Sequence, residues 1–155
     1  MGPYFSGVDL IEIERFQRVL DRHGARFLRR CFTDREVDYC RGRVPELAVR
    51  FAGKEATMKA LGTGMRGISW REVEILANAR GKPIIILHGR ALARATAIGL
   101  DALEISLTHE RSMGCAFVVG GPSVGVGSGA RGGAGVIGGP GPAGGAGFIG
   151  GPGAA

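Results

Sequence analysis

Two acidic residues and one lysine have types and spacings that suit chemistry on a phosphate. Asp9 lies in the segment Gly7–Arg15 (GVDLIEIER), inside an otherwise apolar stretch, where a carboxylate is costly unless it is paired, metal-bound or exposed. Glu55 and Lys59 lie four residues apart in Arg50–Ala60 (RFAGKEATMKA), on the same predicted helix face as several apolar residues. Ordinary surface ion pairs rarely interrupt an apolar face, so we interpret these three residues as candidate functional groups.

A strand acid and a helix acid together supply the oxygen ligands that a hard divalent ion prefers. Magnesium typically uses one or two carboxylates and completes its shell with water and substrate phosphate. The nearby bases Arg50, Lys54 and Lys59 suit a phosphate-bearing substrate. His109, at the end of a predicted strand, has the chemistry to bind a phosphate or move a proton. The ordinary alternatives stay open: a simple helix ion pair for Glu55 and Lys59, and a structural role for His109.

Asp9 is positioned by a predicted strand over residues 4–11, which leads directly into a helix from about Glu12 to His23. This helix has one apolar face and, on its other side, a basic stripe of Arg15, Arg18 and Arg22. If the helix resumes in phase after Gly24, the stripe continues through Arg26 and Arg29. A face of solvated arginines is the plain interpretation of this stripe, and a docking face for an acidic partner is the functional one.

The remaining elements are indicated by their end signals. A capping box from Thr33 to Glu36 opens a short helix that ends near Cys40, and a longer helix runs from Pro45 to Gly62. Strands are predicted over 70–76, 83–87, 103–108 and 115–119, with a turn at 78–81 and a helix over 89–99. This order predicts an α+β fold in which an antiparallel sheet packs on a long helix.

Composition divides the chain into two parts. Of its 29 glycines, 17 lie in residues 120–155, where Arg131 is the single charged residue. Residues 132–143 and 144–155 form a tandem repeat of twelve residues (GGAGVIGGPGPA and GGAGFIGGPGAA). Such sequence buries too little side chain to offset its backbone entropy. We therefore predict one domain over 1–119, followed by a disordered Gly/Pro-rich tail over 120–155.

Cysteine usage and charge restrict the class of protein. The three cysteines have no CxxC spacing, no leader segment is evident, and no apolar run reaches the roughly 18 residues of a membrane helix. We therefore expect a cytoplasmic protein without a membrane partner. Because the isoelectric point is about 9.9, an acidic partner is expected, whether a nucleotide, a nucleic acid or a protein.

Four segments, in this order and spacing, resemble the holo-acyl-carrier-protein synthase family. They are GVDLIEIERF, FAGKEATMKALGTG, WREVEI…GKP…LHGRAL and ISLTHERSMGCAFVV, and the FTxxExxY segment at 32–39 is similar as well. The resemblance covers about residues 5–119. There are few departures: Gly53 stands where alanine is common, which slightly loosens the helix, and Thr108 replaces the more usual serine.

The resemblance implies a magnesium-dependent 4′-phosphopantetheinyl transferase of fatty-acid and lipid biosynthesis. Such enzymes move phosphopantetheine from coenzyme A to a serine of apo acyl carrier protein and release adenosine 3′,5′-bisphosphate. It implies that Asp9 and Glu55 are the magnesium ligands, and that the general base is either His109 or Glu55 acting through a water on the metal. The groups implied in catalysis are Glu55, Lys59 and His109, and those implied in coenzyme A binding are Arg50, Lys54, Lys59, Gly62, Lys82, Pro83 and His109.

The resemblance also implies partners. An acidic acyl carrier protein is expected to dock on Arg15, Arg18, Arg22 and Arg26, and a homotrimer is expected to form the active site between neighbouring copies. The sequence leaves open whether the carrier serves fatty-acid or polyketide synthesis.

Two other functions compete with the transferase. One is a basic nucleic-acid-binding module, favoured by the charge but opposed by phenylalanines that do not alternate with basic residues. The other is a non-catalytic relative that acts as a scaffold through its tail, against which stands the intact set Asp9, Glu55, Lys59 and His109.

Overall fold

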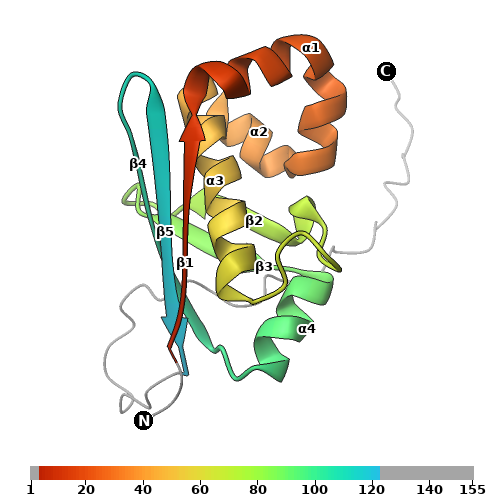
Figure 1. The fold of residues 1–155 in the computed structure, drawn as a ribbon, viewed down its shortest axis with the longest axis vertical. Helices are drawn as coiled ribbons and strands as arrows, with labels where there is room; N and C mark the ends of the chain where they lie inside the picture. Colours follow the sequence, from red (N-terminus) through yellow and green to blue (C-terminus); the bar gives the residue numbers. More distant parts are fainter. Residues whose placement is uncertain (1–3, 123–155) are drawn as a thin grey trace, which may run out of the picture.

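The chain begins with a strand that runs directly into a bent helix. The computed structural model describes residues 4–122, in which β1 (Phe5–Glu12) is followed by α1 (Ile13–Cys31) (Figure 1). Side chains alternate along β1, so that Gly7, Asp9 and Ile11 lie on the side facing the centre of the domain. The predicted helix end near His23 coincides with a break at Gly24, beyond which a second helical stretch continues to Cys31. This glycine departs from helical geometry, with φ 45° and ψ −127°.

The long helix α3 (Val44–Ala60) occupies the centre of the domain and is preceded by the short helix α2 (Asp34–Cys40). Both predicted end signals are present. Thr33 and Glu36 exchange the two hydrogen bonds of a capping box, and Pro45 lies in the first turn of α3. Gly62, just beyond the last turn, has the positive φ of 69° that favours glycine.

The second half of the domain consists mainly of strands. A short 3₁₀ turn (Trp70–Glu72) leads into the hairpin of β2 (Val73–Ala77) and β3 (Pro83–Leu87), so β2 begins three residues later than predicted. Helix α4 (Gly89–Ala97) then connects to β4 (Ala102–His109) and β5 (Met113–Gly121). Strand β5 runs two residues past the predicted end at Val119. The other residues of the predicted tail, 123–155, lie outside the described residues.

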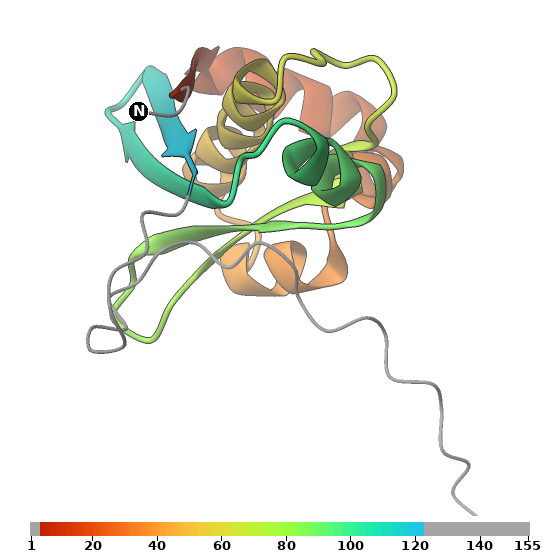
Figure 2. The ribbon, with the colours of Figure 1, turned by 90° about the horizontal axis from the view of Figure 1, so that it is seen from below.

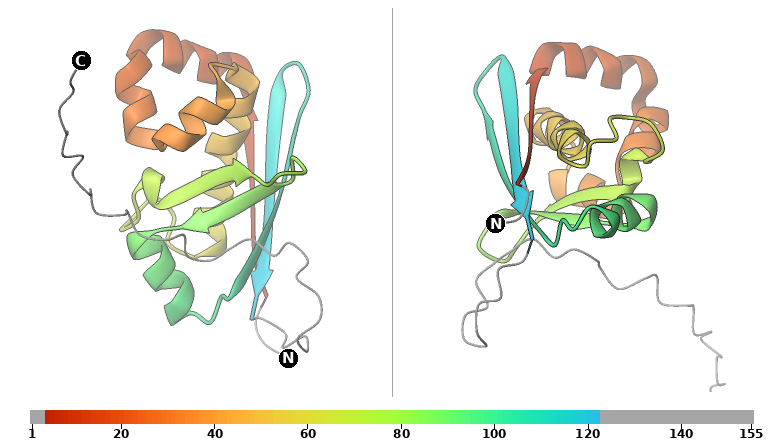
Figure 3. Two further views of the ribbon diagram at one scale, coloured as in Figure 1. Left: turned by 180° about the vertical axis from the view of Figure 1, so that it is seen from behind. Right: turned by 60° about the horizontal axis from the view of Figure 1, so that its bottom comes forward.

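Two antiparallel sheets surround α3. The first has the strand order β1-β5-β4, with Asp9 opposite Ala116, and the second is the β2-β3 hairpin. Helix α3 lies against the first sheet, with α1 and α2 on its other side and the hairpin crossing behind it (Figures 2 and 3). This arrangement confirms the predicted α+β class and the antiparallel sheet packed on a long helix.

Small residues allow α3 to approach both sheets closely. A Cβ atom on Gly7 of β1 would lie 1.9 Å from the carbonyl oxygen of Ala56, so strand and helix touch backbone to backbone there. A Cβ atom on Gly53 would lie 2.6 Å from Cδ1 of Ile75 and 3.0 Å from Cδ1 of Ile105. The glycine that sequence analysis treats only as a weak point of the helix therefore also makes room for both sheets.

Aromatic side chains pack α1 against α3. Phe51 of α3 stacks on Trp70, with ring centroids 4.4 Å apart and planes inclined by 19°. Phe16 and Phe27, from the two halves of α1, each lie within 6 Å of Phe51 between ring centroids. None of the helices within 4–122 is both long and apolar enough to cross a membrane.

Candidate active site

The site forms where β1 passes the C-terminal half of α3. Asp9 is on the α3-facing side of β1, and its side chain is only 13% exposed. Its Oδ1 accepts a hydrogen bond of 2.7 Å from Nζ of Lys59, which also donates to the carbonyl oxygen of Val8 at 2.8 Å. The acid that is costly inside an apolar strand is therefore paired with the lysine that sequence analysis selected.

Glu55 lies one helical turn before Lys59 and meets Asp9 directly. Burial raises the pKa of the Glu55 carboxyl to about 7, aided by a hydrogen bond and charge repulsion from Asp9 and opposed by Lys59. The Glu55 carboxyl therefore binds a proton more readily than an isolated glutamate does. The sequence-predicted residues Asp9, Glu55 and Lys59 thus come together in one group, which we call the carboxylate pair and its lysine.

The donor set of this pair fits magnesium. Two carboxylates supply hard oxygen ligands, and a pair in which one carboxyl readily binds a proton is able to bind a divalent cation instead. Among residues 4–122, no group of three or more histidine, cysteine, aspartate or glutamate side chains is placed to hold a metal ion. Water and substrate phosphate would therefore complete the shell, which is how magnesium is usually bound.

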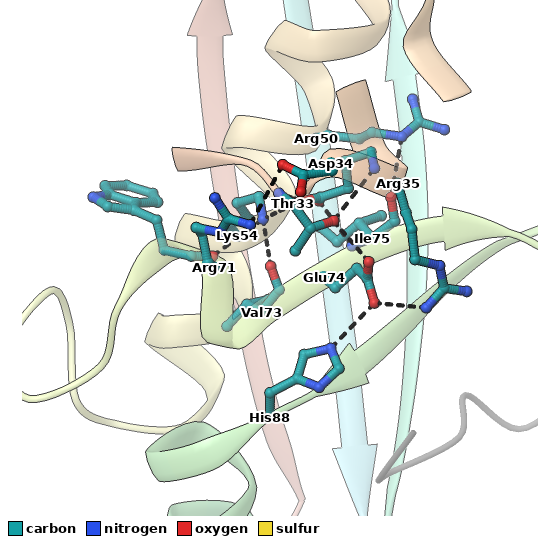
Figure 4. Close-up of polar contacts among 12 residues, drawn as sticks. Thr33, Asp34, Arg35, Arg50, Lys54, Arg71, Val73, Glu74, Ile75 and His88 are labelled. Carbon is teal, nitrogen blue, oxygen red and sulfur yellow. Dashed lines mark hydrogen bonds and ion pairs between the residues drawn. The ribbon is translucent and has the colours of Figure 1, made fainter. Parts of the chain in front are cut away.

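Lys54 and Arg50 extend away from the carboxylate pair and are occupied inside the domain. Lys54 is fully buried, and its Nζ donates to Oε2 of Glu36 at 2.8 Å and to backbone carbonyls of the Trp70–Val73 segment (Figure 4). Arg50 is 3% exposed and donates to the Ile75 carbonyl and to Glu46. Burial lowers the pKa of Lys54, and Glu36 acts against that shift. The predicted contact of these two cations with coenzyme A does not fit this geometry, which gives both a structural role.

Three further predicted residues lie away from the carboxylate pair within one copy of the chain. His109 is exposed at the end of β4, opposite Gly114, and β5 separates it from β1. Lys82 and Pro83 belong to the β2-β3 hairpin, and Nζ of Lys82 forms an ion pair of 2.6 Å with Glu104 on β4. Gly62 differs from these three, because it follows α3 and donates its N–H to the Lys59 carbonyl at 3.0 Å.

The basic stripe of α1 is exposed, but it is not continuous. Arg15, Arg18, Arg22 and Arg26 are all exposed. The break at Gly24 turns the helix between Arg22 and Arg26, as Figure 1 shows, so the condition that the helix resumes in phase is not met. Arg18 pairs with Glu14 at 3.0 Å and with Glu12 at 3.7 Å. On the first half of α1, Arg15 and Arg22 form no ion pair with any residue of 4–122. They are therefore the predicted docking residues most available to a partner.

A pocket that sequence analysis did not predict adjoins Glu55. It has a volume of about 330 Å³ and is lined by the aromatic residues Phe16, Phe27 and Phe51 together with the charged residues Glu12, Arg15 and Glu55. In the sequence, Phe16 and Phe27 belong to the apolar face of the first helix, and Phe51 belongs to that of the long helix. Their convergence depends on the bend of α1, which brings Phe27 back toward α3.

Comparisons with known proteins agree with these features. Residues 6–116 match the model of the 4′-phosphopantetheinyl transferase superfamily. A holo-[acyl-carrier-protein] synthase of Herpetosiphon aurantiacus is 44% identical over 122 residues, covering 74% of this chain and 96% of that protein.

Solved structures of similar proteins have the same fold. The holo-[acyl-carrier-protein] synthase of Neisseria meningitidis matches with a TM-score of 0.68 and 35% identity over 75% of this chain and 96% of that one. The synthase of Bacillus anthracis, solved in complex with CoA (3′,5′-ADP), matches with a TM-score of 0.62 and 31% identity, over 77% of this chain and 96% of that chain.

Proposed function

The chain belongs to the 4′-phosphopantetheinyl transferase superfamily, and we propose that it works as a holo-acyl-carrier-protein synthase through the carboxylate pair Asp9–Glu55. In this reaction a serine oxygen of the apo carrier attacks the phosphorus that bears pantetheine in coenzyme A. The bond from that phosphorus to the bridging oxygen breaks, adenosine 3′,5′-bisphosphate leaves, and the serine proton passes to a base. The observation that carries the proposal is the meeting of Asp9, Glu55 and Lys59 inside the segment that matches the family.

Asp9 and Glu55 would hold magnesium, which supplies electrostatic stabilisation of the pyrophosphate as negative charge grows on the leaving group. Lys59 contributes a cation at the same place. Its side chain is 52% exposed, and the Val8 carbonyl and Asp9 hold its ammonium between strand and helix. An ammonium fixed in this way is able to bind a phosphate oxygen without first losing side-chain freedom.

Two groups are candidates for the base that accepts the serine proton. As a magnesium ligand, Glu55 would accept the proton through a water on the metal rather than directly. His109 is exposed at the end of β4, with β5 between it and β1. We propose Glu55 as the base and assign His109 to the nucleotide part of coenzyme A across a subunit boundary.

An exposed apolar sheet face supports assembly into a homotrimer. On the side of the sheet away from α3, Val8, Leu10, Phe117 and Val119 have exposed fractions of 52%, 64%, 49% and 39%. Val8 and Phe117 are cross-strand partners, so the apolar side chains form a continuous face over β1 and β5. A face of this kind is usually covered, and in a trimer its contacts would place His109 and the hairpin residues Lys82 and Pro83 near a neighbouring copy.

The proposed acceptor is an acidic acyl carrier protein. Arg15 borders the pocket beside Glu55, and Arg22 lies on the same half of α1, so acidic groups of a carrier would find cations close to the reacting centre. We also propose a cytoplasmic location, because all three cysteines are free thiols, as is typical of a reducing compartment.

The test is a reaction of the full chain with coenzyme A, magnesium and an apo acyl carrier protein. We expect the intact mass of the carrier to rise by one phosphopantetheine group while an equal amount of adenosine 3′,5′-bisphosphate is released. A carrier whose acceptor serine is replaced by alanine is the control and should gain no mass. Failure to modify any apo carrier from the same source would contradict the proposal.

A further inference from the structure

Lys54 and Glu55 are consecutive residues of α3 that connect the helix to opposite sides of the domain. Consecutive side chains on a helix differ in direction by about 100°. Glu55 meets Asp9 of β1, whereas Lys54 meets Glu36 and the segment that leads into β2. Any rotation of α3 about its axis therefore moves both groups together.

The environment of Lys54 is built from directional hydrogen bonds. Its ammonium donates to Glu36 at the start of α2, to the Trp70 carbonyl at 3.1 Å and to the Val73 carbonyl, which uses all three of its N–H groups. Glu36 is also fully buried. Its Oε1 accepts from the backbone N–H of Ile75 at 2.9 Å, and its Oε2 accepts from that of Thr33 at 2.8 Å. Figure 4 shows Lys54 in this network, close to Thr33, Val73 and Ile75.

The apolar contacts around Glu55 have little directional character. Ala52, Gly53 and Ala56 are the neighbouring residues of α3 that pack against the sheets, and all are small. These close contacts fix how near α3 lies to the sheets, whereas the angles of hydrogen bonds fix its rotation, because hydrogen bonds weaken steeply when their angles change. Lys59 provides such bonds on the β1 side, to the Val8 carbonyl and Asp9. The contacts of Lys54 provide them on the opposite side, so both are needed to set the rotation of α3.

We propose that Lys54, held by Glu36, is a positioning residue that orients α3 so that Glu55 stays beside Asp9. The proposal rests on the proposed function of the carboxylate pair. It assigns to a fully buried lysine an effect on magnesium binding and turnover, although the lysine touches neither substrate nor metal. A purely structural lysine would affect stability alone.

The test compares two variants with a matched control. Lys54→Met removes the ammonium but leaves the Glu36 charge buried and unpaired, so it is expected to be unstable. Lys54→Met combined with Glu36→Gln removes both charges and is expected to recover much of the stability while still lacking the directional contacts. Leu103→Ala, a cavity variant in the buried part of β4, is the control that lowers stability without touching this network.

Each protein is measured for thermal stability, for magnesium affinity by calorimetry in the presence of coenzyme A, and for kcat of carrier modification. For the double variant we expect at least a tenfold loss in both magnesium affinity and kcat, with an unchanged KM for the carrier. For Leu103→Ala we expect a lower melting temperature with unchanged magnesium affinity and kcat. A double variant with wild-type magnesium affinity and kcat would overturn the positioning role.

Measurements on the wild-type protein distinguish a failure of this proposal from a failure of the proposed function. If it binds magnesium but modifies no carrier, the transferase assignment fails. The comparison of magnesium affinity among the variants still decides whether Lys54 positions Glu55.

Discussion

At the scale of single residues, the proposed chemistry depends on two carboxyl groups, Asp9 and Glu55, that the fold holds together. Burial and the neighbouring Asp9 carboxyl raise the pKa of Glu55 to about 7, and Lys59 offsets only part of this effect. An isolated glutamate carboxyl would be almost fully ionised at neutral pH. In the proposed mechanism, binding of the cation displaces the proton of Glu55, so metal binding and protonation compete at the same group.

Magnesium binding should therefore depend on pH. The raised pKa means that metal-free Glu55 is protonated below pH 7, so a cation must displace that proton in order to bind. We expect the magnesium concentration for half-maximal transfer to be constant above about pH 8 and to rise by up to tenfold per pH unit below pH 7. The measurement is a magnesium titration of carrier modification between pH 5.5 and 8.5. Equal half-maximal concentrations at pH 6 and pH 8 would contradict the account.

Residue types and spacing predicted Asp9, Glu55 and Lys59 as one group because a strand and a helix that pack together bring such positions into contact. The same reasoning grouped Arg50 and Lys54 with them, but in the structure these two side chains extend away from the carboxylate pair. Helical periodicity shows which residues share a face, but it does not show which element covers that face. The groups that accept hydrogen bonds from Lys54, among them Glu36 and the Val73 carbonyl, are distant from it in sequence. The sequence around Lys54 therefore does not indicate that this lysine is buried.

At the scale of elements, the site exists because β1 and α3 approach each other unusually closely. Gly7 allows the approach by presenting no side chain to the Ala56 carbonyl. The helix ends were predictable from local chemistry, as with the capping box at Thr33 and the proline at position 45. The break at Gly24 was foreseen only as an interruption, because its backbone angles depend on the packing of Phe27 against Phe16 and Phe51.

Gly7→Ala should separate β1 from α3. A Cβ atom 1.9 Å from a backbone oxygen requires the strand to move. We expect the free energy of unfolding to fall by about 2–3 kcal/mol, as overpacking in a rigid contact does, and transfer to fall more than tenfold because Asp9 moves away from Glu55. Chemical denaturation and the carrier assay measure the two effects. The neighbouring exposed substitution Ser6→Ala should change neither, and a Gly7→Ala variant with wild-type stability would contradict the described contact.

At the scale of the whole molecule, one face of the domain is apolar and another is basic. The apolar face over β1 and β5 supports assembly of copies, and the first half of α1 presents cations beside the pocket at Glu55. Neither surface follows from the composition, which averages the domain with its glycine-rich extension. The apolar face becomes evident only from the sheet register, which places Val8 opposite Phe117.

Phe117→Asp should disrupt the proposed trimer. A charge at the centre of the apolar face would be desolvated on assembly, so the copies should separate. We expect light scattering after size-exclusion chromatography to show a trimer for the wild-type chain and a monomer for the variant, with loss of transfer activity. Ser106→Asp, at the exposed cross-strand neighbour of Phe117 on β4, tests how far the interface extends. A wild-type chain that is monomeric and active would contradict this assembly.

Charge reversal on α1 should affect carrier recognition rather than chemistry. For Arg15→Glu combined with Arg22→Glu we expect kcat/KM for the carrier to fall about tenfold or more at low salt, with less effect at high salt, and the KM for coenzyme A to stay unchanged. Arg41→Glu combined with Arg66→Glu, which reverses two exposed charges outside α1, is the matched control. An equal loss in both proteins would show that net charge, and not this face, attracts the carrier.

The most direct test of the central claim is the intact mass of an apo acyl carrier protein followed over time with coenzyme A and magnesium. Three proteins are compared: the wild-type chain, Asp9→Asn and Glu55→Gln. The account predicts that the wild-type chain adds one phosphopantetheine group to each carrier, and that both variants, still folded by circular dichroism, lose at least a thousandfold in rate. Wild-type rates in either variant would contradict the claim that this carboxylate pair performs the transfer.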